Sequence, residues 1–291
     1  MALRTRVPNP MLGWDDRDVH LPRYTVTSPQ GASKPVAPTV VVFDLDGTLA
    51  PSKSKIDPTM AVLLLRLLRQ VDVCIISGGR FEQYQEQVLD ALGDSDDLVR
   101  LHLMPTCGTR YYRWRSHTWA LAYTQDLTRD ERSRTTAALT EGAKSLGLWE
   151  TNTWGPIIED RGSQVTYSAL GQSAPIDAKT RWDPDGSKKE KLRVHVAALI
   201  PDLEVRSGGS TSVDVTRKGI DKAYGIKQLQ QQLNVALEDL LFVGDRLDEG
   251  GNDYPVKALG VECIAVADWQ ATAHYVAELL DQLPTTNGET P

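Results

Sequence analysis

The sequence predicts an α/β protein in which a doubly wound parallel sheet carries an inserted α+β domain. Three observations lead to this prediction. The runs "TVVVFDLD" (39–46) and "VDVCIISGG" (71–79) are short and apolar, as in central parallel strands that are buried on both faces. Helical patterns alternate with such runs at both ends of the chain. Between residues 112 and 215, alternating apolar and polar stretches favour an antiparallel sheet.

The elements follow in an order that is typical of a Rossmann-like domain. Asp57 is a good N-cap, and Gly93 is a good C-terminal stop. The first part predicts strand 39–46, helix 57–70, strand 71–79, helix 80–93 and strand 98–108; the last part predicts helix 222–234, strand 239–245, helix 253–259, strand 261–267 and helix 272–283. Two polar helices are expected near 128–147 and 186–199. We therefore predict an extended lead-in over 1–37, a core domain over 38–111 and 216–291, and a cap domain over 112–215.

Composition excludes several classes of partner. The 291 residues carry a formal charge of −7 without a basic run, so nucleic acid and anionic membranes are not expected to bind. The three cysteines lack metal-ligand spacing, which indicates a reduced, intracellular protein. No apolar stretch approaches the ~20 residues that span a bilayer. We expect a soluble, cytoplasmic protein whose partner is a small molecule, with a homodimer as one possible assembly.

Residues of the types found in catalytic sites follow three of the predicted parallel strands. Asp44 and Asp46 end the first, Ser77-Gly78-Gly79 end the second, and "GDRLDEGGND" (244–253) ends a third with Asp245 and Asp253. The carboxyl ends of such strands form one ligand crevice, and Lys222 opens the helix before the third of these strands. Carboxylates this close repel one another, and Mg²⁺, which takes oxygen ligands and a substrate phosphate, would offset the repulsion. The pattern predicts Mg²⁺-dependent phosphoryl transfer.

The expected roles follow from this chemistry. One ionised Asp attacks phosphorus to form an aspartyl-phosphate, and the other protonates the leaving oxygen and then deprotonates water. Ser77, Lys222 and the backbone N–H groups near Gly47 and Gly78 would bind the phosphoryl oxygens. Gly47 permits a close turn, and Thr48 is expected to hydrogen-bond the second Asp.

These residues resemble the four motifs of the haloacid dehalogenase (HAD) superfamily. "DLDGT" is similar to the first motif, Ser77 to the second and Lys222 to the third, while Asp245 and Asp253 match the fourth. The resemblance implies that Asp44 is the nucleophile and Asp46 the general acid/base. It also implies that Asp44, the Asp46 backbone carbonyl and Asp245 bind Mg²⁺, with Asp253 in or next to the ligand set.

Each motif also has an ordinary interpretation. "DLDG" could begin a calcium loop, but such a loop has Gly at position six and Glu at position twelve, which this segment lacks. Ser77-Gly78-Gly79 could be a simple turn, Lys222 a solvated helix residue, and Asp253 a helix cap. A non-catalytic sugar-phosphate-binding protein is a third possibility, but such a protein has no physical reason to keep repelling carboxylates.

The insertion of 144 residues between Ser77 and Lys222 resembles a type IIB cap, and the chain is similar to eukaryote-type phosphomannomutases. Their DVDGTLTPAR, FEKVQEQ, GGQISFDVFPDGWDK and GDKTMPGGND resemble "DLDGTLAPSK", "FEQYQEQ", "GGSTSVDVTRKGIDK" and "GDRLDEGGND". The resemblance implies that Ser212 and Asp214 contact the sugar, with Gly79, Thr48 and Arg161 also in the substrate site. Positions two apart in a strand share a face, so Ser212 and Asp214 could reach sugar hydroxyls together, although a solvent-facing pair is the ordinary interpretation.

The departures from that family concern the cap. Trp154 and Gln172 stand where its outer cap arginines would be, while Arg161 is retained; Ser52 and Lys53 replace an arginine after the first motif. A mutase must hold two phosphates, and each lost guanidinium removes contacts worth about 1.5–3 kcal/mol. We therefore predict a phosphatase for a hexose phosphate of the mannose or glucose 6-phosphate type. A phosphomannomutase that interconverts mannose 1-phosphate and mannose 6-phosphate is the alternative.

Overall fold

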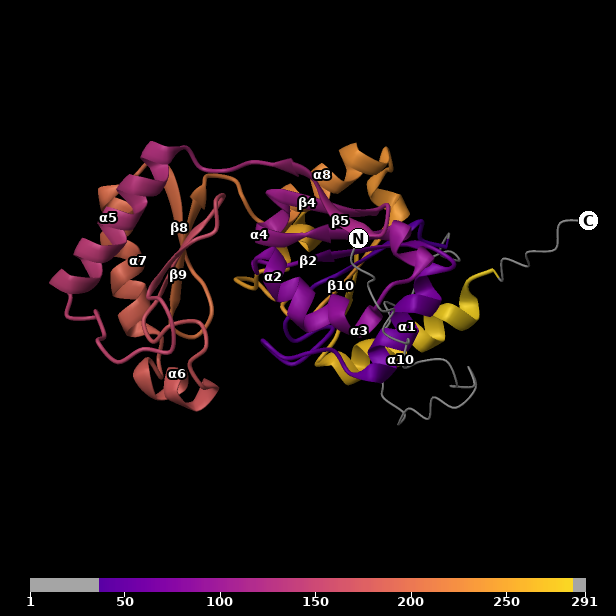
Figure 1. Ribbon diagram of the computed structural model, residues 1–291, viewed down its shortest axis with the longest axis horizontal. Helices are drawn as coiled ribbons and strands as arrows, with labels where there is room; N and C mark the ends of the chain where they lie inside the picture. Colours follow the sequence, from indigo (N-terminus) through magenta and orange to yellow (C-terminus); the bar gives the residue numbers. More distant parts are fainter. Residues whose placement is uncertain (1–36, 285–291) are drawn as a thin grey trace, which may run out of the picture. The chain divides into compact units, whose positions relative to one another are not determined.

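The computed structural model describes residues 37–284, so the extended lead-in predicted over 1–37 lies outside the described residues except for its last position. The chain divides into two compact units. The core unit ends its first segment at residue 122 and resumes at 225, and the second unit, which we call the cap unit, spans 123–224. Each unit is built around one sheet in the described chain (Figure 1).

The core sheet confirms the predicted doubly wound α/β fold. Its strand order is β11 (Glu262–Ala265), β10 (Leu240–Gly244), β1 (Val40–Phe43), β2 (Asp72–Ile76), β3 (Leu101–Met104), β4 (Arg110–Arg115) and β5 (Thr118–Thr124). The first five strands in that order are parallel. Strand β1 lies between β10 and β2 and is wholly buried, as its uniform apolar run predicts. The carboxyl ends of β10, β1 and β2 are therefore neighbours at one edge.

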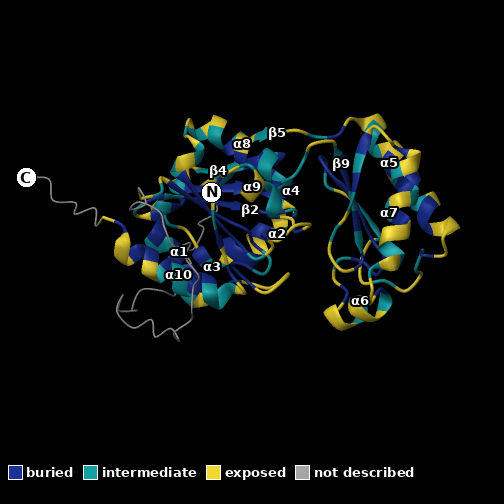
Figure 2. Ribbon diagram, turned by 180° about the vertical axis from the view of Figure 1, so that it is seen from behind, coloured by how far each residue is buried: buried dark blue, intermediate teal, exposed yellow. Residues whose placement is uncertain are grey.

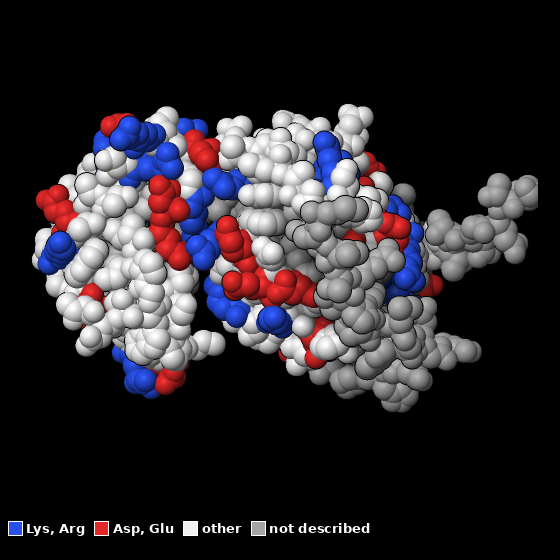
Figure 3. Space-filling model, viewed as in Figure 1, with Lys and Arg blue, Asp and Glu red and all other residues white. Residues whose placement is uncertain are grey.

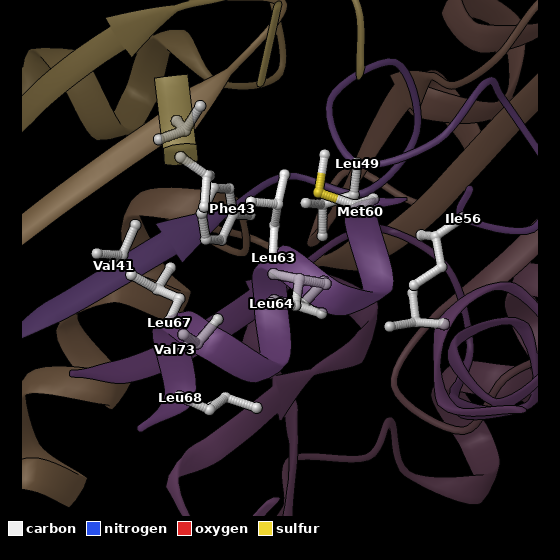
Figure 4. Packing of buried hydrophobic residues seen from close by; sticks show 14 of the residues in the cluster. Val41, Phe43, Leu49, Ile56, Met60, Leu63, Leu64, Leu67, Leu68 and Val73 are labelled. Carbon is white, nitrogen blue, oxygen red and sulfur yellow. The ribbon is translucent and has the colours of Figure 1, made fainter. Parts of the chain in front are cut away.

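Helix α1 (Pro58–Leu68) shows how the core is held together. The Asp57 carboxylate accepts a hydrogen bond from the backbone N–H of Thr59 (2.8 Å) and caps the helix. Leu63, Leu64 and Leu67 are buried and face β1 and β2 (Figure 4), where Phe43 is among the side chains they meet. Full burial of each leucine contributes about 1.5–3 kcal/mol. This packing fixes the sheet whose edge carries the functional residues.

The other core helices differ in length and regularity. They are α2 (Phe81–Tyr84), the π-helical turn η1 (Gln85–Leu89), α3 (Asp90–Leu92), the 3₁₀ turns η2 (Asp96–Arg100) and η3 (Leu237–Asp239), α4 (Pro105–Gly108), α8 (Lys222–Leu233), α9 (Tyr254–Ala258) and α10 (Trp269–Gln282). The sequence predicts one regular helix over 80–93, whereas the structure interrupts it with a π-helical turn. The division between the two units falls inside α8, between residues 224 and 225.

The boundary between core and cap lies later than the predicted position at 111/112. Strands β4 and β5 extend the core sheet beyond β3, and β4 pairs antiparallel with β3. Tyr112 stacks on Phe81 with ring centroids 4.1 Å apart, which ties β4 to the core. The alternating pattern of this hairpin is the same as that of a cap strand, so periodicity alone could not assign it. On the C-terminal side, residues 216–224 group with the cap unit, whereas we predicted them in the core.

The cap unit is the predicted α+β domain. Its sheet has the order β6 (Ile158–Asp160), β7 (Val165–Ser168), β9 (Ser212–Arg217), β8 (Leu203–Ser207), and all pairs are antiparallel. Its helices are α5 (Arg129–Ser145), α6 (Ile176–Trp182) and α7 (Ser187–Leu199); α6 was not predicted. The buried strand residues Val165 and Val215 belong to one cluster with Leu139 and Leu192 of the helices. Figure 2 shows the largely buried strands beside α5 and α7, which carry exposed as well as buried residues.

Charged side chains are mixed on the surface. On the face drawn in Figure 3, basic and acidic groups lie beside one another in both units. Exposed pairs such as Arg134–Asp202 (2.8 Å) and Arg181–Asp177 (2.8 Å) are examples. Among the described residues, no helix has the length and apolar character needed to cross a bilayer.

Candidate active site

Three carboxylates converge at the carboxyl edge of the core sheet. Asp44 follows β1, Asp245 follows β10, and Asp253 precedes α9. One carboxylate oxygen from each lies within 4.8 Å of the other two. Asp44 is 3% exposed and Asp253 is fully buried, so their charges are largely removed from water. Buried like charges at this separation need a cation or a proton to neutralise them.

Two glycines make room for this cluster. Gly47 has φ +91°, and a Cβ atom there would lie 2.5 Å from Asp245 Oδ2. A Cβ atom at Gly244 would lie 2.5 Å from Asp253 Oδ2. The backbone thus approaches two carboxylates as closely as only glycine permits. Three carboxylate oxygens in a compact group are the hard donors that a divalent cation such as Mg²⁺ prefers, so the residues fit a metal site.

Thr48 has a different partner from the one predicted. Its hydroxyl donates to Asp245 Oδ1 at 3.4 Å rather than to Asp46. The left-handed turn at Gly47 directs the chain back towards β10, which explains the change of partner. Thr48 is fully buried and helps to orient a carboxylate of the cluster.

Asp46 lies apart from the cluster of three and is held by other groups. The backbone N–H of Lys53 donates to Asp46 Oδ1 (2.7 Å), and the Lys53 ammonium lies 2.9 Å from Oδ2. Gln87 Nε2 also donates to Oδ1, at 3.2 Å. Burial by itself raises the pKa of Asp46, but the charge and hydrogen bonds of Lys53, together with Gln87, outweigh it and place the pKa below the usual value. These contacts favour the ionised form of the carboxylate and hold both of its oxygens.

Hydrogen bonds hold the loop Ser77-Gly78-Gly79 at this edge of the sheet. The backbone N–H of Gly79 donates to Ser77 Oγ (3.1 Å), and the carbonyls of Ser77 and Gly79 accept from the backbone N–H groups of Cys107 and Thr106 (both 2.9 Å). Ser77 is buried, whereas a Cβ atom at Gly78 would meet open space. The predicted phosphate-binding loop is therefore rigid, with a gap at its central residue.

Lys222 is the first residue of α8, and its side chain is 1% exposed. Gly225, one turn further along α8, packs against Gly108 and the side chain of Ile76; a Cβ atom there would lie 2.8 Å from the carbonyl oxygen of Cys107. This close approach fixes the core part of α8 beside the ends of β2 and β3. A buried ammonium is stable only when hydrogen-bonded or paired with negative charge, so Lys222 is not the solvated helix residue of the ordinary interpretation.

Ser212 and Asp214 share one face of the cap sheet, as predicted for alternate residues of a strand. Ser212 Oγ lies 2.9 Å from Ser168 Oγ, and the Thr166 hydroxyl donates to Asp214 Oδ1 at 2.7 Å. Ser168 and Thr166 are buried in the neighbouring strand β7. The face opposite the apolar cluster thus carries a row of hydroxyl groups beside Asp214, and the cross-strand neighbours Glu159, Glu204 and Arg206 lie on the same face. Such groups can hydrogen-bond the hydroxyls of a sugar.

Charged groups on this face have polar partners. Nε and NH2 of Arg161 donate to Glu159 Oε2 (3.2 and 2.8 Å), and the Arg161 side chain is 7% exposed. Gln172 Nε2 donates to Ser168 Oγ at 2.6 Å, whereas Trp154 is 47% exposed. Trp154 and Gln172, which stand in the places of two family arginines, therefore carry no positive charge.

Sequence reasoning missed three residues with clear structural roles. Gln87 contacts Asp46 from a π-helical turn that no pattern in the sequence predicts. Lys53 was considered only as a residue in the place of an arginine, yet it is paired with Asp46. Arg206 is the cross-strand neighbour of Asp214, and its NH1 group donates to the carbonyl of Ile220 (2.6 Å). A register of β8 against β9, had it been predicted, would have placed Arg206 beside Asp214.

Comparison with known proteins agrees with this geometry. The family model of eukaryotic phosphomannomutase matches residues 60–281. Human phosphomannomutase 1 is 28% identical over 225 residues, covering 75% of this chain and 82% of that protein. The phosphomannomutase of Encephalitozoon cuniculi is 26% identical over 240 residues, covering 75% and 84%.

Solved structures share the fold at lower identity. An IMP-bound IMP-nucleotidase of Plasmodium falciparum has a TM-score of 0.63 at 15% identity, covering 84% of this chain and 67% of that one. A haloacid dehalogenase-like hydrolase from Bacteroides thetaiotaomicron has a TM-score of 0.54 at 17% identity, covering 83% and 99%. With a family match over three quarters of its length, an HAD-type fold and clustered motif carboxylates, the chain belongs to the eukaryotic phosphomannomutase family of the HAD superfamily.

Proposed function

We propose that the protein is a Mg²⁺-dependent phosphomannomutase that interconverts mannose 1-phosphate and mannose 6-phosphate. This is the reaction that the sequence analysis ranked second, and the family match through both units now favours it. The observation that carries the proposal is the convergence of Asp44, Asp245 and Asp253 within 4.8 Å at the edge of the core sheet.

The metal site would consist of these three carboxylates and the backbone carbonyl of Asp46. When bound, Mg²⁺ supplies charge neutralisation and a fixed position for a phosphate oxygen. The Ser77 hydroxyl, the backbone N–H of Gly78 and the Lys222 ammonium donate to the remaining phosphoryl oxygens. Gly79 shapes this loop, and Thr48 orients Asp245.

Asp44 performs the transfer itself. Its carboxylate oxygen forms a bond to phosphorus while the bond from phosphorus to the sugar oxygen breaks. In the opposite half-reaction Asp46 takes a proton from the sugar hydroxyl that accepts the phosphoryl group, and it returns this proton to the leaving oxygen here. In a mutase the reverse transfer returns the phosphoryl group to the other hydroxyl through a hexose bisphosphate. Ser212 and Asp214 bind sugar hydroxyls during this exchange, and Arg161 contributes to the same face.

Hydrolysis of a hexose phosphate is the second candidate, and one observation favours it. The arginines of the cap face, Arg161 and Arg206, are each paired with a glutamate, and the uncharged Gln172 and Trp154 stand at the two departures. A phosphatase needs no site for a second phosphate, whereas a mutase must retain its bisphosphate against water. If water rather than sugar accepts the phosphoryl group, Asp46 deprotonates that water.

A paired assay separates the two candidates. Mannose 1-phosphate is supplied with Mg²⁺, with and without hexose 1,6-bisphosphate, and both mannose 6-phosphate and inorganic phosphate are measured. A mutase forms mannose 6-phosphate faster than phosphate and is accelerated by the bisphosphate; steady phosphate release without isomerisation would favour the phosphatase. EDTA should abolish either activity and Mg²⁺ should restore it, so turnover in chelator would contradict the metal site.

A further inference from the structure

Gln87 occupies an unusual place in the core. It lies in the π-helical turn η1, is 5% exposed, and makes contacts with both its side chain and its backbone. Its backbone carbonyl accepts from the N–H of Ile56 (2.8 Å), and its side-chain Nε2 donates to the carbonyl of Ser54 (3.1 Å) and to Asp46 Oδ1 (3.2 Å). One residue of the helix therefore ties the loop 52–56 to the carboxylate of Asp46.

The chemistry of these contacts permits only one orientation of the amide. Both partners of Nε2, a backbone carbonyl and an ionised carboxylate, are acceptors, so the NH₂ group must face them. Among the described residues, Gln87 Oε1 is buried and has no hydrogen-bond partner. Leaving an acceptor unpaired costs free energy. The side chain therefore gives up one hydrogen bond in order to hold Asp46 and the loop.

The π-helical turn explains how Gln87 reaches both groups. A π turn adds a residue to one turn of the helix, which shifts the direction of the following side chains, and such turns are frequent at functional sites. Here Gln87, Val88 and Leu89 are buried in succession, a run that a regular amphipathic helix does not sustain. The loop that Gln87 secures carries Lys53, which contacts both oxygens of Asp46.

We propose that Gln87 is a positioning residue for proton transfer: it orients Asp46 directly and, through the loop 52–56, also places Lys53 against it. This inference rests on the proposed role of Asp46 as the acid that protonates the leaving oxygen. It adds that the orientation of the acid depends on a side chain from another element. Among the described residues, the side-chain hydrogen bonds of Gln87 go to Asp46 and Ser54 and not to the carboxylates of Asp44, Asp245 and Asp253.

The inference predicts a dependence on the leaving group. A sugar alkoxide must be protonated as it departs, whereas p-nitrophenolate leaves without a proton. Loss of the Gln87 contact should therefore slow transfer from a sugar phosphate and spare transfer from p-nitrophenyl phosphate. A residue that only supports the fold would slow both equally.

The test compares Gln87→Met, which keeps side-chain length without the amide, with Gln85→Met, an exposed glutamine of the same turn. We expect kcat/KM for mannose 1-phosphate to fall about 10- to 100-fold in Gln87→Met, the effect of one charge-assisted hydrogen bond. The value for p-nitrophenyl phosphate should stay within about twofold, and Gln85→Met should match the wild type on both substrates. Equal losses on the two substrates, or no loss on the sugar phosphate, would overturn the inference.

Two further variants distinguish a failure of the positioning role of Gln87 from a failure of the acid role of Asp46. Lys53→Met changes a side chain that is 40% exposed, so it tests the same selective loss without risk to the core. Asp46→Asn should show the largest selective loss. If Asp46→Asn lost activity selectively and both Gln87→Met and Lys53→Met did not, the positioning role alone would be wrong. If Asp46→Asn itself showed no dependence on the leaving group, the proposed acid role of Asp46 would be wrong as well.

Discussion

The edge of the core sheet and the polar face of the cap sheet use opposite kinds of chemistry. At the core edge, three carboxylates, two of them buried, lie together and are approached by glycine backbone, an arrangement that is costly without a cation. On the cap face, hydroxyls satisfy one another, and the buried arginine is paired with a carboxylate. The first arrangement fits a cation together with a charged group. The second offers hydroxyls and paired charges that could bind the hydroxyls of a sugar.

This difference between the core edge and the cap face predicts which residues control the reaction and which control substrate selectivity. Each core carboxylate lies within a few residues of a strand end, so its position follows from a local motif. Each cap contact joins residues that are distant in sequence, such as Thr166 and Asp214, and depends on strand register. We expect substitutions at the core edge to abolish turnover and substitutions on the cap face to change which substrate is turned over.

The largest effect is expected at Asp44. Asp44→Asn keeps the shape of the side chain but removes the carboxylate that we propose as the nucleophile, so activity towards every phosphate ester should fall at least about 1,000-fold. Circular dichroism and thermal unfolding should confirm that the variant is folded. Retention of more than about a tenth of the activity would contradict the aspartyl-phosphate mechanism.

A smaller and selective effect is expected on the cap face. Replacing both Trp154 and Gln172 by arginine adds two positive charges to the cap unit, and if both face the substrate it should tighten binding of a hexose bisphosphate by about 2–4 kcal/mol. Calorimetry measures this gain directly, and hydrolysis of a monophosphate at Asp44 should change little. Unchanged bisphosphate affinity would mean that these positions do not face the substrate.

The smallest effect concerns stability: we expect the stability of the core unit, but not that of the cap unit, to fall as the pH is lowered. Burial lowers the pKa of His102, which is fully buried in β3 and lies 3.5 Å from Asp72. As pH falls below about 6.5, the unfolded chain binds this proton before the folded protein does, so the core unit loses stability. In the cap unit, the hydrogen bonds from Arg217 and Thr128 lower the pKa of Glu131 to about 2, so this pair stays ionised.

Hydrogen exchange at pH 7 and pH 5 checks this difference unit by unit. Protection should decrease in the core strands and remain in α5 and β9 of the cap. His102→Gln should flatten the pH dependence of the core. Equal loss of protection in both units would show that His102 does not control the acid response.

The sequence predicts features that depend on local motifs better than features that depend on tertiary contacts. The strands β1, β2 and β10 and the residues at their ends were predicted, because buried parallel strands have uniform apolar runs and the site sits at their tips. The hairpin β4–β5 was assigned to the cap, because a half-exposed hairpin alternates in the same way as a cap strand. The π-helical turn with Gln87 was missed, since its extra residue is set by tertiary contacts rather than by local propensity.

The partner of Thr48 shows the limit of reasoning from neighbours in sequence. Asp46 is two residues away, yet the hydroxyl bonds Asp245, which is 197 residues away, because Gly47 reverses the chain. Likewise, the retained Arg161 did not reveal that Glu159 is its partner. Site residues can be named from motifs, but their hydrogen bonds depend on the assembled fold.

The most direct test of the account is to capture the phosphorylated enzyme. The protein is mixed with mannose 1-phosphate and Mg²⁺, quenched in acid within one turnover, and digested for peptide mass spectrometry. The account predicts that the peptide containing Asp44 gains the mass of one phosphoryl group, and that Asp44→Asn and EDTA-treated enzyme gain none. Turnover of the substrate with an unmodified Asp44 peptide, or a phosphoryl group on another residue, would contradict it.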